Sequence, residues 1–93
     1  MAAVSKAVVS VLGYDRKGII AKVSTVLYER GINILDISQT IVSGYFNMMM
    51  IVDPSDSSKE LAEYSRELDQ LGQEIGVKIR CQNEDIFEMM HRI

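Results

Sequence analysis

The fold is decided by residues 7–31, which read AVVSVLGYDRKGIIAKVSTVLYERG. Apolar and small residues alternate over residues 4–12 of the chain, and this period of two predicts a β-strand. A polar loop follows over residues 13–18. Apolar residues then recur every three or four positions and predict a helix, which Gly31 is expected to end. The stretch is therefore a strand, a short loop and a helix.

The rest of the chain repeats these elements in another order. Alternation over residues 32–42 and 45–52, separated by Ser43-Gly44, predicts a hairpin. The spacing of Ser57 and Glu60 is that of a capping box before a second helix over residues 61–75. Alternation resumes over residues 77–81 and predicts a fourth strand. Asn83 is then expected to cap a short tail helix that carries Ile86, Met89, Met90 and Ile93.

The order βαββαβ predicts an α+β protein with the ferredoxin-like sandwich fold. We expect a four-stranded antiparallel sheet with both helices on one face, because each helix carries only one apolar stripe. The other face of the sheet, or one of its edges, is then available for association. We expect one domain over residues 4–82 and a helical tail over residues 83–93.

Composition excludes several classes of protein. The chain has 93 residues, a net charge of −3 and one cysteine. The weak charge disfavours binding to nucleic acid, and a lone Cys81 forms neither an internal disulfide nor a structural thiolate site. The sequence shows no signal-like start and no apolar run long enough to span a bilayer, so we expect a cytoplasmic protein without membrane contact. His91 alone makes no useful metal site, and no metal or cofactor is expected.

The sequence offers little for catalysis. A metal carrier of this fold would place two cysteines after the first strand, and an RNA-binding sheet would display aromatic and basic residues. Here the middle of the third predicted strand is Met48-Met49-Met50, which predicts two side chains in the core and one on the opposite face. An acylphosphatase-like site would use Arg16 with Asn33 or Asn47, but the glycine spacing differs from that family. We expect a protein that is not an enzyme.

The loop over residues 13–18 is the best candidate site. It leads into a helix N-terminus, where free backbone N–H groups and the helix dipole attract a small carboxylate. Gly18 lets a ligand approach closely, and Asp15 offers a carboxylate for an ammonium group. Asn33, at the start of the second predicted strand, has both a donor and an acceptor. Together these groups suit an α-amino acid, although Asp15 also fits a helix cap, and Gly18 and Asn33 also fit turns.

Two motifs resemble those of the ACT domain, a regulatory module that binds small molecules. These are Gly-Tyr-Asp-Arg-Lys-Gly-Ile-Ile-Ala-Lys-Val-Ser over residues 13–24 and Gly-Ile-Asn-Ile over residues 31–34. The likeness covers nearly the whole chain. It is greatest to small stand-alone ACT proteins and to the ACT modules of regulators of the glycine-cleavage type. Neither kind has an attached catalytic domain.

The resemblance implies a homodimer or a higher homo-oligomer that binds an amino acid between chains, with the first loop of one chain facing the second strand of the other. It implies ligand-binding roles for Asp15, Gly18, Ile19 and Asn33. Gly13 departs from serine-binding members that have a histidine there, and Lys17 replaces a common proline. We therefore expect a regulatory module that signals to an enzyme or regulator. The alternatives are a dimeric interaction adaptor without a ligand and the acylphosphatase-like hydrolase.

Overall fold

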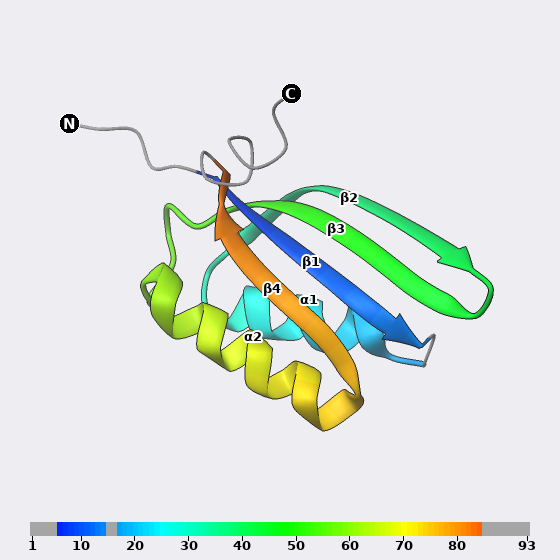
Figure 1. Cartoon of the computed structure of the whole chain (residues 1–93). Helices are drawn as coiled ribbons and strands as arrows, with labels where there is room; N and C mark the ends of the chain where they lie inside the picture. The colour runs from blue at the N-terminus through cyan, green and yellow to red at the C-terminus, as the bar shows by residue number, and fades with distance from the viewer. Residues whose placement is uncertain (1–5, 15–16, 85–93) are drawn as a thin grey trace.

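A computed structural model describes residues 6–14 and 17–84 of the chain (Figure 1). Strands and helices follow in the predicted βαββαβ order. Their bounds are β1 (Ala7–Tyr14), α1 (Ile19–Glu29), β2 (Asn33–Val42), β3 (Tyr45–Asp53), α2 (Leu61–Ile75) and β4 (Val77–Asn83). The ferredoxin-like α+β fold is thereby confirmed. The predicted tail helix lies outside the described residues, and the division between domain and tail stays a prediction.

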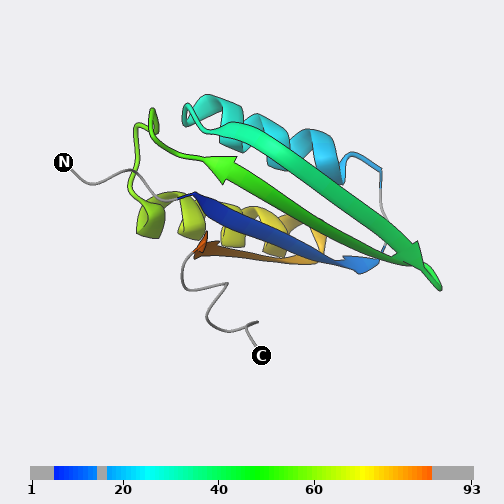
Figure 2. The same cartoon turned by 90° about the horizontal axis from the view of Figure 1, so that it is seen from above.

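The four strands form one antiparallel sheet in the order β2-β3-β1-β4. Both helices cover the same face of the sheet, and no helix among the described residues covers the other face, hereafter the open face (Figure 2). The register places Val9 of β1 between Met50 of β3 and Cys81 of β4. In the described part of the chain, β2 and β4 are the two edge strands.

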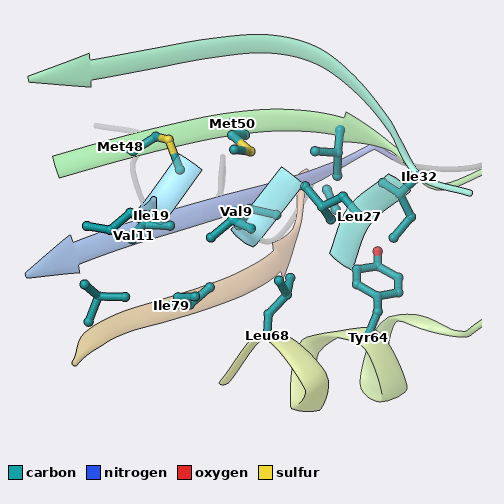
Figure 3. Packing of buried hydrophobic residues seen from close by; sticks show 14 of the residues in the cluster. Val9, Val11, Ile19, Leu27, Ile32, Met48, Met50, Tyr64, Leu68 and Ile79 are labelled. Carbon is teal, nitrogen blue, oxygen red and sulfur yellow. The ribbon is translucent and has the colours of Figure 1, made fainter. Parts of the chain in front are cut away.

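The core lies between the sheet and the two helices. Every second residue of β1 and β3 points into it, including Val9, Val11, Met48 and Met50, none of which is exposed to solvent. The helices contribute buried Leu27, Tyr64 and Leu68, which face these strands (Figure 3), and Val23 belongs to the same cluster. Met49 points to the opposite face and is 39% exposed. The predicted division of the methionine run is therefore confirmed.

The start of α2 differs from the prediction. The capping box is formed by Glu60 at the N-cap and Glu63 three residues later, and not by Ser57 and Glu60. The Ser57 hydroxyl instead accepts a hydrogen bond from the Lys59 backbone N–H and donates one to the Lys59 carbonyl. The predicted spacing was wrong by three residues because the loop after β3 uses Ser57 for its own turn. Glu60 supplies the same acceptor chemistry that a serine would.

The hairpin turn forms where the sequence predicts it. Ser43 and Gly44 both have left-handed backbone, with φ of 52° and 82°. Two consecutive positive φ values give the twist that joins adjacent antiparallel strands in a two-residue loop. The turn therefore fixes the register of β2 on β3. Among the described residues, no helix has the length and apolar character needed to cross a bilayer.

Candidate functional site

The connection between β1 and α1 ends at Gly18, which is the N-cap residue of α1. Its φ of 82° is left-handed, a conformation that glycine adopts without the steric cost that other residues incur. The Gly18 carbonyl accepts the first helical hydrogen bond from the Lys22 N–H at 2.9 Å. A β-carbon at Gly18 would meet only the Lys22 Cε, at 3.9 Å. The glycine therefore serves the backbone turn, and among the described residues only Lys22 lies near the position of a β-carbon.

A hollow of about 520 Å³ lies beside this helix start. The start of α1, the C-terminal half of β2 and one residue of β3 line it. These residues are Gly18, Ile19, Ile20, Ala21, Gln39, Ile41 and Phe46. Ile19 is only 2% exposed, and its side chain points into the core (Figure 3). A ligand in the hollow would therefore meet the backbone of Ile19. The first N–H groups of an α-helix have no acceptor within the helix, so they are available for an anion.

Of the predicted site residues that the structure describes, Gly18 and Ile19 line the same hollow, but Asn33 does not reach it within one chain. Asn33 is the first residue of β2 and pairs with Asp53 at the end of β3. Gly18 precedes α1 and Asn33 follows it, so the whole helix of eleven residues lies between them. Such a helix is about 16 Å long, which is more than an amino acid spans. Asn33 is exposed, and Asp15 lies outside the described residues.

The structure explains why position 13 has no side chain. Gly13 in β1 pairs with Val77 in β4. A β-carbon on Gly13 would lie 2.8 Å from the Val77 Cγ1 and 3.0 Å from its Cα. Contacts this short require the neighbouring strand to move. A side chain as large as histidine at position 13 would therefore require β4 to move.

Gln39 and Ile41 were not predicted as site residues. The register between β2 and β3 is the observation that identifies them. Ile41 pairs with Phe46 and Ile37 pairs with Met50, so both isoleucines share the face of the sheet that carries the core. They are nevertheless 57% and 44% exposed, because β2 is an edge strand. Alternation alone predicts that both would be buried. Strand order had to be known before the exposed edge could be recognised.

Two neighbouring titratable groups among the described residues, on β4 and α2, have raised pKa values. Cys81 lies on the core side of β4, and burial raises the pKa of its thiol to about 12. Burial also raises the pKa of the Tyr64 hydroxyl, which contacts Cys81, to about 12. Both groups are therefore neutral at physiological pH. Over residues 6–14 and 17–84, no three histidine, cysteine or acidic side chains gather in a way that could hold a metal ion.

Comparison with known families decides the class of this fold. A model of the ACT domain matches residues 5–82. The chain belongs to the ACT domain family. A UPF0237 protein of Bifidobacterium longum is 54% identical to this ACT domain over 89 residues, which cover 96% of this chain and 99% of that protein. The resemblance inferred from residues 13–24 and 31–34 is thereby confirmed.

Solved structures agree with this assignment. An ACT domain protein from Streptococcus pneumoniae has a TM-score of 0.80 and 42% identity, with 92% of this chain and 97% of that one covered. The regulatory subunit of aspartate kinase from Thermus thermophilus has a TM-score of 0.65 and 27% identity, with 86% and 52% covered. This ACT domain is therefore similar both to a protein of its own size and to part of a regulatory subunit.

Proposed function

We propose that this ACT domain is a regulatory module that binds an amino acid, or a similar small carboxylate, between two copies of the chain. The observation that carries the proposal is the hollow beside Gly18, together with the position of Asn33 at the far end of α1. One chain offers a carboxylate site that its own Gln39 helps to line, but its Asn33 is too distant to contact the same ligand. A second chain supplies an Asn33 in this proposal.

The edge of β2 is the surface through which we propose that the two copies meet. β2 has ten residues, and Asp36 is its only charged one. The opposite edge strand, β4, carries Lys78 and Arg80. Charges of one sign on an edge strand oppose its pairing with a second copy of the same strand, whereas a long edge with little charge favours such pairing. The contrast between the two edges therefore favours self-association through β2.

Antiparallel pairing along the whole of β2 completes the hollow. Such pairing brings the N-terminal end of the partner strand, with Asn33 of the partner subunit, beside the C-terminal half of β2. The hollow is lined by Ile41 and Gln39, so the start of the partner strand becomes its missing wall. The two equivalent sites of the dimer then lie at the two ends of the paired strands. Each site uses residues from both chains.

The chemistry of this site matches a zwitterion. The backbone N–H groups at the start of α1 bind the carboxylate, and the helix dipole favours its negative charge. The side-chain oxygens of Gln39 and of Asn33 of the partner subunit accept hydrogen bonds from the ammonium group. Asp15 is proposed to supply a carboxylate for the same ammonium group. Bound between chains, the ligand stabilises the dimer in proportion to its preference for that state.

The regulatory part of the proposal is supported by the likeness to the regulatory subunit of aspartate kinase. A ligand that fixes the geometry of the dimer changes which surface is presented to another protein. That protein is an enzyme or a regulator in this proposal. In this proposal the ACT domain itself catalyses no reaction.

Calorimetry with each of the twenty amino acids tests the proposal. We expect at least one to bind with a stoichiometry of one per chain, and Asn33→Ala to weaken it about tenfold through loss of one hydrogen-bonding side chain. Asn47→Ala is the matched control, because Asn47 is also an exposed asparagine on a strand. Equal losses in both variants, or no heat with any amino acid, would contradict the proposal.

A dimeric adaptor without a ligand is the second candidate. It is favoured by the open face of the sheet, where Leu12, Tyr14, Tyr45 and Met49 are exposed on adjacent strands. Such a face suits a protein partner. The adaptor predicts a complex that forms without any amino acid and that survives Asn33→Ala but not Tyr14→Ser. A complex that requires an amino acid would exclude it.

A further inference from the structure

The groove beside β4 has features that the proposed ligand site does not use. It lies between α2 and the outer edge of β4, and its volume is about 430 Å³. Ala62, Ser65 and Arg66 line it from the helix. Lys78 to Gln82 line it from the strand. In the described part of the chain no strand pairs with β4 on this side.

Positive charge is concentrated at this groove. Arg66, Lys78 and Arg80 all line it, although the chain as a whole has a net charge of −3. The ion pair found in the described residues joins Arg30 to Glu67. It involves none of the three cations in the groove. Asp69 is the acidic residue in the lining, and its carboxylate accepts a hydrogen bond from the Gln73 amide. The groove therefore offers three cations to an incoming group.

The alternation of β4 sorts the lining into two faces. Ile79 and Cys81 pair with Val11 and Val9 and share the core side of the sheet with them. Lys78 and Arg80 pair with Leu12 and Ser10 on the open side. A strand added along β4 would therefore place every second side chain beside the two cations, and the intervening ones beside Ile79 and the α2 residue Ala62.

We propose that the β4 edge binds an extended acidic segment of a partner protein, which adds to the sheet as a fifth strand. Strand addition supplies main-chain hydrogen bonds, and alternate side chains supply specificity. The complementary segment has carboxylates at every second position and small apolar residues between them. This inference names a partner for the proposed regulatory module, but it does not depend on the amino-acid site.

The competing explanation is that Lys78 and Arg80 only prevent pairing at an edge. The two explanations predict different peptide binding and different oligomeric states when the cations are replaced. If the cations only guard the edge, replacing them with neutral residues makes the protein self-associate through β4, and no acidic peptide binds. If they recognise a partner, the same replacement weakens an acidic peptide and leaves the oligomeric state unchanged.

The experiment uses the full chain and a fluorescein-labelled peptide of alternating valine and glutamate. Fluorescence anisotropy measures affinity, and amide NMR shifts locate the site. We expect binding that moves the amides of residues 77–82, weakens with salt, and falls about tenfold in the variant Lys78→Glu with Arg80→Glu. The control Lys22→Glu with Lys59→Glu makes the same charge change outside the groove and should bind normally.

Two further peptides separate the components of the interaction. A lysine version should not bind, because its charges oppose the cations. A version with methylated backbone nitrogens should lose binding, because it cannot form the ladder of main-chain hydrogen bonds. Equal binding by either one, unchanged affinity in the Lys78→Glu and Arg80→Glu variant, or no binding at millimolar peptide would overturn the proposal.

The neutral variant Lys78→Ser with Arg80→Ser provides a second route if the charge reversal disturbs folding. Weaker peptide binding with an unchanged oligomeric state supports the proposal, whereas self-association through β4 overturns it. Calorimetry with amino acids should be the same in every β4 variant. A failure of the peptide experiment would therefore not contradict the amino-acid site. A failure of amino-acid binding would likewise not contradict the peptide site at β4.

Discussion

Arg30, at the C-terminal end of α1, donates two parallel hydrogen bonds to the carboxylate of Glu67 on α2. The Arg30 Nε lies 2.7 Å from Glu67 Oε1, and its Nη2 lies 2.6 Å from Oε2. The Arg30 carbonyl also accepts a hydrogen bond from the Ser58 N–H, which belongs to the loop before α2. One residue thus joins both helices and a loop at the end of the domain that carries Asn33.

The first prediction concerns the pH dependence of this pair. Arg30 lowers the pKa of Glu67 below its ordinary value of 4.5, mainly through the hydrogen bonds. A carboxyl whose pKa is lower in the folded state stabilises the fold above its unfolded pKa, and this contribution is lost as the pH falls through the folded value. Thermal melts should therefore show Glu67→Gln slightly less stable than wild type at pH 7. The difference should shrink below pH 4.5, and a constant difference would contradict the role assigned to the pair.

The second prediction separates the members of the methionine run. Met48 is fully buried, so Met48→Ala should reduce the free energy of unfolding by about 2–5 kcal/mol through loss of contacts and creation of a cavity. Met49 is 39% exposed on the open face. Met49→Ala should change stability by about 0.5 kcal/mol or less. Urea denaturation of both variants measures the difference, and similar losses would show that the register of β3 is wrong.

The third prediction concerns two glycines that are needed for different reasons. Gly13→Ala brings a β-carbon within 2.8 Å of Val77, so the variant should lose about 1–3 kcal/mol by overpacking. Gly18→Ala meets no such atom but keeps a left-handed backbone, and it should lose about 1 kcal/mol. Denaturant melts of both variants, and of Gly13→Ala with Val77→Ala, test the distinction. The second change should partly relieve the first, whereas simple additivity would argue against the contact.

The fourth prediction concerns the reactivity of Cys81. Burial raises the pKa of its thiol from 9.0 to about 12, so the thiolate fraction near neutral pH falls about a thousandfold. Alkylation by iodoacetamide should accordingly be very slow in the folded protein and fast in urea. The same shift lowers stability as the pH rises above 9, because the unfolded chain then loses a proton that the folded chain keeps. Rapid labelling of the native protein would contradict the burial of this side chain.

The sequence predicted the elements well because each has its own local signal. Alternation around Val9 and Val11, and the left-handed turn at Ser43-Gly44, depend on a few neighbouring residues. The start of α2 was misplaced because Ser57 and Glu60 both have side chains that can cap a helix. Local spacing alone does not tell which acceptor the backbone will use.

The candidate site was predicted less completely because it depends on contacts between distant segments. Gly18 was found from the loop that precedes a helix, and its positive φ fits that role. Ile41 and Gln39 became candidates only when the strand order placed β2 at an edge beside α1. The clash between Gly13 and Val77 likewise joins residues 64 positions apart in the chain. Such relationships depend on topology, which local patterns do not contain.

Crystals grown with a mixture of the twenty amino acids test the central claim most directly. We expect two chains joined through their β2 edges, with a ligand whose carboxylate contacts the first N–H groups of α1 and whose ammonium lies near Asn33 of the partner subunit. A dimer joined elsewhere, with the space beside Gly18 filled only by solvent, would contradict it.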